Sequence, residues 1–319
     1  MNARQWDRLQ SLAPLVGAVL LVLAGSFFYP KFLSAGYLLQ QLQIASFLGV
    51  IAAGSMIVIL LGQIDLSIPW TLTGAAIIST SLAGTGDPTL TALAIPGGLF
   101  FGAFIGAVNG VGVAILRIPA MVWTLAVNAM LLGVAVLNTG GFNPKGEASP
   151  LMIELAAGRL AGIPIAAEVW FAVSVLALLL LHRTTFGRYL IAIGNSEKAT
   201  YLSGVDTFRV VILAFVISGT CSALGGIMLA GYANQAYQSM GDPYLMPVIA
   251  AVVIGGTSIL GGSGSYVGTV SGVLFITVLT SILSIMQLAD AWRQIIFGGI
   301  ILMMLLMQGL RPRLHSSSS

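Results

Sequence analysis

Long apolar runs separated by short polar turns dominate the sequence. Most of these runs approach the length of about 20 apolar residues that a membrane-spanning helix needs. The runs cover residues 12–29, 44–62, 68–84, 89–116, 119–139, 165–182, 209–231, 246–260, 266–288 and 292–310. Glycine, proline and aspartate mark the turns between several of them, as at 84–88 and 241–243. The pattern predicts an all-α polytopic membrane protein with about ten transmembrane or re-entrant helices.

Composition supports this class. The 319 residues are 57% hydrophobic and only 7% charged, whereas a soluble domain carries roughly a quarter charged residues. The 39 glycines fit a membrane bundle, in which small residues let helices approach closely. A single cysteine, Cys221, excludes an internal disulfide. Arg4 and Arg8 precede the first run, which is long enough to span and is interpreted as an uncleaved helix rather than a signal peptide.

The basic residues indicate an orientation. If the amino terminus is cytoplasmic, alternation of the runs places nine basic residues inside: Arg4, Arg8, Arg117, Arg183, Arg188, Lys198, Arg209, Arg311 and Arg313. Four fall outside: Lys31, Lys145, Arg159 and Arg293. This excess follows the positive-inside rule. Both termini and the segment 183–206 are therefore expected in the cytoplasm, and the net basic charge requires no nucleic-acid partner.

The segment 183–206 carries several charges between apolar runs and predicts a short helix. Asn195 or Ser196 is suited to cap its start, with Glu197 in the first turn, and Gly204 to end it. Ala199 and Leu202 lie three residues apart and form a small apolar face. Such a helix suits the groove of a partner protein. The alternative, an ordinary loop that only solvates two helix ends, stands equally well at this point.

Catalytic signals are scarce. No phosphate-binding sequence of the type G-x-x-x-x-G-K-[ST] occurs, so ATP hydrolysis by that route is excluded. The paired glycines follow no strand and are interpreted as helix breaks or close-packing sites; they are Gly255, Gly256, Gly261 and Gly262. His182 and His315 have no neighbours suited to a metal site or a catalytic triad. The chain is predicted to be neither an enzyme nor a cofactor-binding protein.

A few polar residues within apolar surroundings are candidates for a solute pathway. Asp65, beside Ser67 and Trp70, lies where a helix breaks, so it either lines a cavity or caps the next helix. Asn109, Trp123 and Asn128 offer hydrogen bonds or a stacking face to a polar solute, or else hydrogen bonds between helices. No carboxylate is assigned to a mid-span position, which disfavours a proton-driven carrier.

A short internal echo suggests a repeat. The sequence Val-Ile-Ala-Ala at 50–53 precedes Gly62 and Asp65, and the same four residues at 248–251 precede Gly261 and Ser265. Both segments are expected to run from outside to inside, as in the parallel repeats of transporters. A chance match is the alternative.

From about residue 38 to residue 310 the chain resembles the permease subunits of bacterial ATP-binding-cassette importers, in the branch that serves ribose and other monosaccharides. Four groups of residues carry the resemblance. They are Gly62-Gln63-Ile64-Asp65-Leu66-Ser67; Asn109-Gly110 with Thr124-Leu125; Thr185-Phe186-Gly187-Arg188 followed by Ala192-Ile193-Gly194-Asn195 and Leu202-Ser203-Gly204-Val205; and the run 249–258 with Gly261-Gly262. Several ordered motifs together make the resemblance specific for the family.

The resemblance implies one transmembrane permease domain over residues 1–319, with a core at 38–310 and a flexible tail at 314–319, in the bacterial inner membrane. It implies three protein partners besides lipid: a cytoplasmic ATPase that binds the ATP, a periplasmic sugar-binding protein, and a second permease subunit, identical or paralogous. The helix in the cytoplasmic segment would be the coupling helix. Its residues would be Gly187, Arg188, Gly194, Asn195, Glu197, Ala199, Leu202, Ser203 and Gly204.

For the solute pathway, the resemblance adds Thr124 to the residues around Asp65. Departures from the family pattern at Gln63, Leu132, Leu245 and Pro247 leave the solute open. A permease for branched-chain amino acids or another polar solute is the nearest alternative, and a stand-alone carrier is the alternative of a different class.

Overall fold

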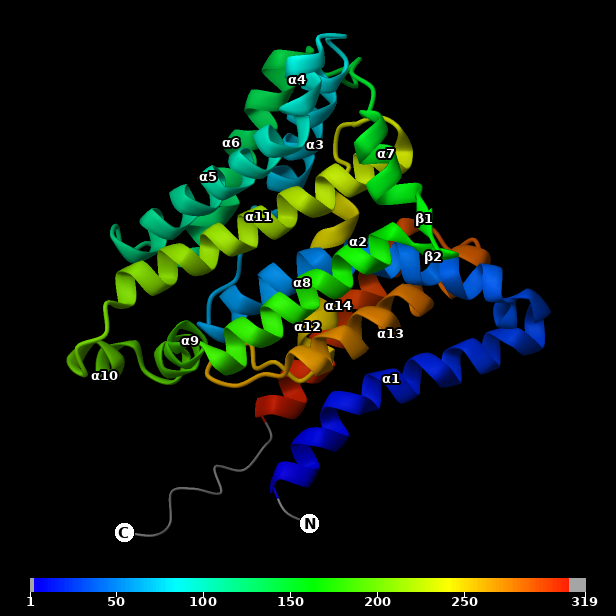
Figure 1. Cartoon of the computed structure of the whole chain (residues 1–319). Coiled ribbons are helices and arrows are strands. Elements are labelled where there is room, and N and C mark those ends of the chain that lie inside the picture. The colour runs from blue at the N-terminus through cyan, green and yellow to red at the C-terminus, as the bar shows by residue number, and fades with distance from the viewer. Residues whose placement is uncertain (1–2, 310–319) are drawn as a thin grey trace.

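The structure is a computed structural model that describes the backbone of residues 3–309 and, within it, the side chains of 12–27, 29–289 and 291–306. It is a helical bundle with one short hairpin (Figure 1). The helices that correspond to the ten apolar runs are α1 (Ala3–Phe28), α2 (Ala35–Leu60), α3 (Ile68–Ala83), α5 (Ala94–Ala114), α6 (Ala120–Thr139), α8 (Ile165–Arg183), α11 (Thr207–Ala233), α12 (Leu245–Ile254), α13 (Tyr266–Ile285) and α14 (Asp290–Gly309). The predicted all-α membrane fold is confirmed.

Shorter elements connect them. They are η1 (Pro30–Leu33), α4 (Pro88–Ala92), α7 (Pro150–Ala157), α9 (Thr185–Asn195), α10 (Glu197–Leu202), η2 (Asp242–Tyr244) and the antiparallel strands β1 (Arg159–Leu160) and β2 (Ile163–Pro164). Six helices, α2, α5, α6, α8, α11 and α13, are long and apolar enough to cross a membrane by length and composition. Four further apolar helical stretches are shorter: 12–27, 68–83, 242–254 and 291–306.

Helices α2 and α11 form the centre of the bundle. Most of α2 is buried, and α11 packs against α5, α2 and α3. Small residues bring α11 and α5 together: a Cβ added to Gly102 would overlap the carbonyl oxygen of Gly219, and a Cβ on Gly106 would overlap that of Phe215. Glycine therefore acts here as it does in other membrane helix pairs, by letting two backbones touch.

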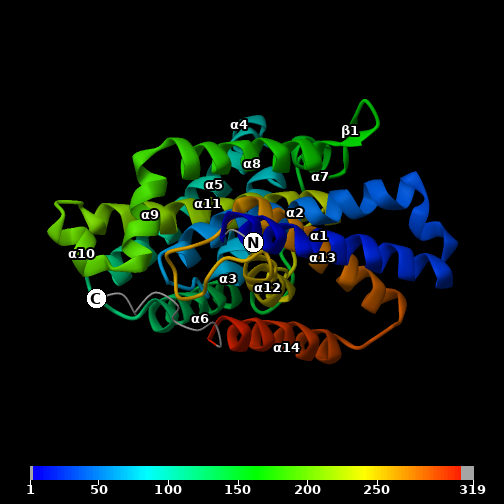
Figure 2. The ribbon, with the colours of Figure 1, turned by 90° about the horizontal axis from the view of Figure 1, so that it is seen from below.

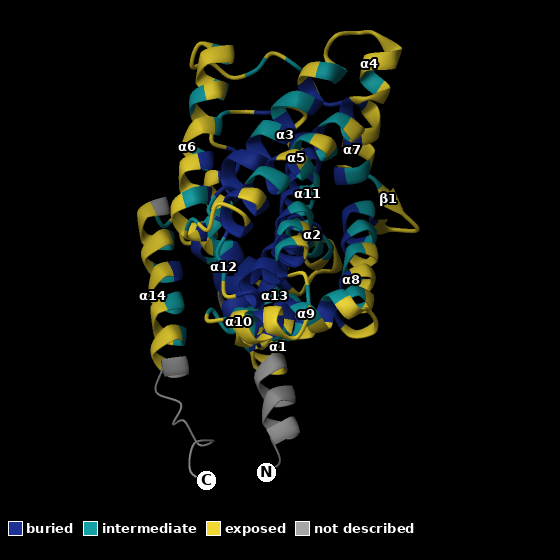
Figure 3. Ribbon diagram, turned by 90° about the vertical axis from the view of Figure 1, so that its left-hand side faces the viewer, coloured by how far each residue is buried: buried dark blue, intermediate teal, exposed yellow. Residues whose placement is uncertain are grey.

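The bundle has two distinct ends. Helices α9 and α10 lie at one end, and α4 and α7 lie toward the other (Figure 3). The hairpin lies beside α7, far from α9 and α10 (Figure 1). Seen from below, α6 and α14 are at one side of the bundle and α8 at the opposite side, with α2, α11 and α12 between them (Figure 2). Arg117 contacts Glu197 of α10, whereas Lys31, in η1, and Arg159, in β1, belong to the opposite end. The structure thus separates these basic residues as the alternation of runs predicts; Arg311, Arg313 and the tail 314–319 lie outside the described residues.

Apart from shifts at the ends of the runs, such as the start of α2 at Ala35 where 44 was expected, the structure differs from the expected runs in four places. The run 89–116 is divided into α4 and α5 at Leu93, and α12 ends at Ile254 because Gly255 and Gly256 follow, the latter with φ +89°. Helix α9 and helix α7 were not expected. Ser149 caps α7 by accepting a hydrogen bond from the Met152 N–H, with a proline in the first turn.

Candidate functional site

Helix α10 begins and ends at the residues that favour such a boundary. Ser196 has an extended backbone, and its hydroxyl oxygen accepts a hydrogen bond from the Ala199 N–H at 3.3 Å. Glu197 is in the first turn, where a carboxylate is stabilised by the helix dipole. Beyond the helix, Gly204 has φ +85°, a backbone conformation that favours glycine. Ser203 lies at the last turn, and its hydroxyl donates to the Ala199 carbonyl.

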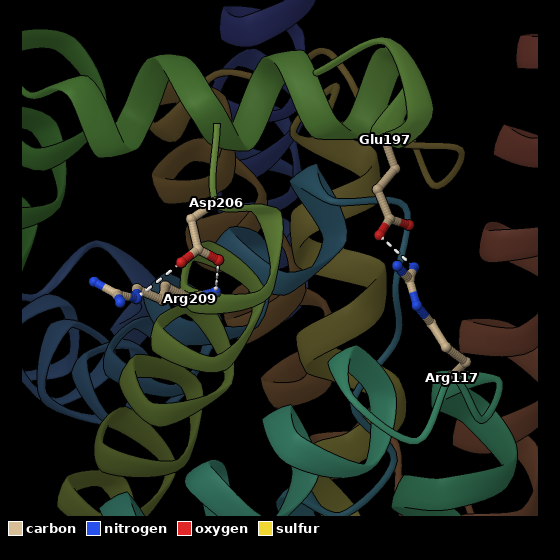
Figure 4. Close-up of polar contacts among 4 residues, drawn as sticks. All are labelled: Arg117, Glu197, Asp206 and Arg209. Carbon is tan, nitrogen blue, oxygen red and sulfur yellow. Dashed lines mark hydrogen bonds and ion pairs between the residues drawn. The ribbon is translucent and has the colours of Figure 1, made fainter. Parts of the chain in front are cut away.

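Exposed contacts hold α10 against the bundle. A guanidinium nitrogen of Arg117, from the α5–α6 connection, lies 2.7 Å from a carboxylate oxygen of Glu197 (Figure 4). The same guanidinium lies 4.8 Å from the centre of the Phe208 ring, and the Tyr201 ring meets Phe208 edge-on. At the start of α11, Asp206 forms an ion pair with Arg209 (Figure 4). Glu197 and Tyr201 therefore attach α10 to the α5–α6 connection and to the start of α11.

The outer face of α10 is uncovered. Leu202 is 76% exposed and Tyr201 is 56% exposed, and Ala199 is also exposed, whereas Thr200 is buried. The predicted apolar face of Ala199 and Leu202 thus points away from the bundle. Two large apolar side chains in a six-residue helix form a surface suited to a protein partner.

Helix α9 links this surface to the centre of the bundle. Its last residues, Gly194 and Asn195, lie against the turns that follow α2 and α12. The Asn195 side-chain amide donates to the Gly262 carbonyl at 3.2 Å, and the Gly262 N–H donates to the Leu60 carbonyl at 3.0 Å. A Cβ on Gly194 would overlap both the Leu60 oxygen and the Gly262 nitrogen. We call Leu60, Gly62, Gly194, Asn195, Gly261 and Gly262 the break junction.

Glycine conformation is required at the break junction. Gly62 and Gly261 have φ +74° and +86°, and a Cβ on Gly261 would lie 2.6 Å from the Gly62 nitrogen. Gly62 and Gly261, which follow the two Val-Ile-Ala-Ala sequences, are therefore in contact. Gly255 lets the end of α12 pack closely on α13, because a Cβ there would lie 2.5 Å from the backbone of Gly268. The other two predicted coupling residues lie near the start of α9: Gly187 packs on the end of α8, and Arg188 is exposed.

The residues around Asp65 form one buried hydrogen-bonded network. Asp65 is 3% exposed, and one of its carboxylate oxygens accepts from the Ser67 N–H at 3.0 Å and from the Ser67 hydroxyl at 2.6 Å. The other oxygen accepts from the Ser218 hydroxyl of α11 at 3.1 Å. Asn109 of α5 donates to the Ser67 hydroxyl at 2.7 Å. The network thus joins the start of α3 to α5 and α11.

Helix α6 attaches to the same helix start. The Leu66 N–H donates to the Thr124 hydroxyl at 2.9 Å, and the Trp70 N–H donates to the Asn128 side-chain oxygen at 3.3 Å. The Trp123 indole donates to the Val108 carbonyl of α5 at 3.2 Å. All seven predicted pathway residues therefore lie together, in contacts between helices. Asp65 accepts a hydrogen bond from the Ser67 N–H at the start of α3, as the capping interpretation from the sequence expected.

A cavity of about 530 Å³, lined by apolar and uncharged polar side chains, lies elsewhere, at the end of α2 opposite the break junction. It is lined by Tyr37, Gln40, Gln41, Ile44, Leu48, Tyr237, Pro243, Tyr244, Pro247, Thr277, Thr280, Ser281, Ser284 and Ile285. None of the seven predicted pathway residues is among these. Of the lining, the sequence argument used only Pro243, within the turn 241–243, and Pro247, as a departure from the family pattern. A usable signal was present: Thr277, Thr280, Ser281 and Ser284 are polar residues spaced three and four apart within an apolar run.

Comparison with known proteins identifies the family. The family described as "Branched-chain amino acid transport system / permease component" matches residues 37–305. This chain belongs to that permease family. It is similar to the ribose import permease RbsC of Bacillus subtilis, at 34% identity over 94% of this chain and 92% of the relative. RbsC of Haemophilus influenzae is 31% identical over 91% and 90% of the two chains.

The autoinducer 2 import system permease LsrC of Escherichia coli is 32% identical over 94% of this chain and 87% of the relative. No solved structure matches the chain. Family membership makes the chain a multi-pass membrane protein and the permease component of an ABC importer, not an enzyme. Permeases of this kind work with an ATPase and a solute-binding protein.

Proposed function

We propose that this permease forms the membrane pathway for a monosaccharide, ribose or a related sugar, that a periplasmic binding protein delivers. The names of the relatives support a small sugar-like solute, since they import ribose and autoinducer 2. A branched-chain amino acid, the solute in the family description, is the second candidate. A second permease subunit, identical or paralogous, completes the pathway, and ATP is bound by the ATPase.

The proposal rests on one observation: α9 connects α10 directly to the break junction. The exposed apolar face of Tyr201 and Leu202 offers a docking surface to the ATPase. The end of α9, one residue before α10, touches the turns that follow α2 and α12 through Gly194 and Asn195. A displacement of α10 by the ATPase would therefore reach both turns within a few residues. Rigid-body movement of packed helices is a common form of such switching.

We assign the network around Asp65 to the wall of the pathway. Its side chains are buried in the present arrangement, so they would meet a solute only after α6 moves away from the start of α3. Thr124 and Asn128 of α6 each hold the start of α3 through a single hydrogen bond from a backbone N–H. Such contacts are replaced at low cost when water or a hydroxylated solute offers equivalent bonds.

The proposed orientation places α9, α10 and both termini in the cytoplasm of a cell whose inner membrane holds the protein. Lys198 and Lys145 are exposed at opposite ends of the bundle. In a Cys221→Ala background, Lys145→Cys should react with a membrane-impermeant maleimide applied to intact cells, and Lys198→Cys should react only after lysis. Labelling of both from outside would reverse this assignment.

Proteoliposomes test the function. The permease reconstituted with a matching ATPase and a ribose-binding protein should accumulate D-ribose only when ATP is supplied. The permease alone should accumulate none under a proton gradient, since the chain has no nucleotide-binding motif of its own. Accumulation by the permease alone would indicate a secondary carrier. ATP-driven uptake of leucine in place of ribose would favour the second candidate.

A further inference from the structure

We propose that the cavity between α2, α13 and the α11–α12 connection is a binding site for a neutral, polyhydroxylated solute and discriminates against amino acids. The inference rests on the proposed function and adds to it the place and the chemistry of solute selection. The cavity is about 530 Å³, within the range of small-molecule sites. It lies at the end of the bundle where a binding protein outside the cell would release its solute.

The wall formed by α13 is rich in hydrogen-bond acceptors. The hydroxyls of Thr277, Thr280 and Ser284 donate to carbonyl groups of their own helix, at 2.8, 2.7 and 2.7 Å. Each hydroxyl has a single proton but two lone pairs. With their protons engaged, these oxygens offer only acceptor sites to the cavity. A ligand that carries several O–H donors matches this wall.

The facing wall supplies a buried acceptor that lacks a partner. The Gln41 side-chain amide donates to the Ser281 hydroxyl at 3.0 Å, and that hydroxyl also lies 2.8 Å from the Tyr37 phenol oxygen. Gln41 is 8% exposed, and its Oε1 has no hydrogen-bond partner in the described part of the chain. A buried acceptor without a donor is unfavourable. A solute hydroxyl would satisfy it.

Charge distinguishes the two candidate solutes. None of the described residues that line the cavity is charged. The carboxylate and ammonium groups of an amino acid would leave water for a site without a counter-ion, which is costly in a membrane protein. A sugar carries no charge, and its C–H faces pack favourably on rings such as those of Tyr37, Tyr237 and Tyr244. The lining therefore favours a sugar over leucine.

Protection of an engineered cysteine tests the site without measuring transport. Ser284 is exposed at the cavity, so Ser284→Cys in a Cys221→Ala background provides a probe; Thr85→Cys, in the exposed α3–α4 turn, is the control. The full transporter in membrane vesicles without nucleotide is labelled with a maleimide. D-ribose at about ten times its dissociation constant should slow labelling at position 284 about tenfold. It should leave position 85 unchanged, and leucine should protect neither.

A second pair of variants assigns the protection to Gln41. Gln41→Leu in the probe background should abolish protection by D-ribose. Gln43→Leu is the matched control, because Gln43 is on the same helix, is equally buried and does not line the cavity. Protection by leucine equal to that by ribose, no protection by ribose, or unchanged protection in Gln41→Leu would each overturn the inference. Retained ATP-driven ribose uptake in those cases would leave the proposed function intact. Protection by ribose without ATP-driven ribose uptake would support the binding site but contradict the proposed function.

Discussion

Two carboxylates, Asp65 and Glu197, each join segments that are distant in sequence, but in opposite environments. Asp65 is 3% exposed and accepts three hydrogen bonds from Ser67 and Ser218. The Glu197 side chain is 41% exposed and meets Arg117, which is 56% exposed. Water competes with the second pair and is excluded from the first. The comparison indicates that α3 is fixed firmly in the bundle, while α10 is attached loosely enough to respond to a partner.

Removing the buried carboxylate should have the largest effect on stability. Asp65→Ala leaves the Ser67 hydroxyl and N–H and the Ser218 hydroxyl without their acceptor, at a cost of about 3 kcal/mol or more. The thermal unfolding temperature of the purified permease in detergent should fall clearly. Asp65→Asn, which keeps the shape and one acceptor oxygen, should lie between wild type and Asp65→Ala. Equal stability of all three proteins would mean that the network contributes little.

A charge placed on the exposed face of α10 should act on assembly instead. Ala199→Arg should leave the fold unchanged because Ala199 faces solvent, but it would place an unpaired charge in the proposed interface with the ATPase. A loss of about 1.4 kcal/mol corresponds to tenfold weaker binding. We expect normal membrane insertion, weaker copurification of the ATPase and reduced uptake. Ala157→Arg, at an exposed alanine of α7 at the opposite end, is the control and should keep all three properties.

If the ATPase remained bound to Ala199→Arg and uptake stayed normal, α10 would be an ordinary loop element. That was the second interpretation of the segment 183–206. The structure adds weight to the docking interpretation through the exposure of Leu202 and Tyr201.

The exposed ion pair should matter least. Glu197→Gln removes the charge opposite Arg117, and exposed pairs contribute less than about 1 kcal/mol. The unfolding temperature should change little, and the small effect should shrink further at high salt. A destabilisation as large as that of Asp65→Ala would show that α10 is fixed as firmly as α3, which would contradict the comparison.

Local chemistry predicted the elements better than it predicted their contacts. The apolar runs and the residues Ser196, Glu197 and Gly204 specify helices through interactions over a few positions, so they could be identified from sequence. The contact between Asp65 and Ser218 joins residues 153 apart. The contact of Gln41 with Ser281 joins residues 240 apart. Neither follows from a local pattern, and the cavity that the second pair lines was missed for that reason.

Helix α9 was missed for a different reason. Gly187 and Gly194 are poor helix formers, so they weaken the local helix signal over 185–195. In the structure both are required by close contact, with the end of α8 and with the break junction. The residues that weaken the local helix signal are those that place the helix.

The number of sugar molecules transported per ATP hydrolysed tests the central claim most directly, that force passes from α10 to the pathway through the break junction. Gly194→Ala would push α9 away from Leu60 and Gly262, whereas Gly133→Ala adds a Cβ into open space on α6. In proteoliposomes, we expect Gly194→Ala to keep ATPase binding and hydrolysis while the transport ratio falls severalfold, with Gly133→Ala unchanged. An unchanged ratio in Gly194→Ala would show that the junction does not couple the two activities.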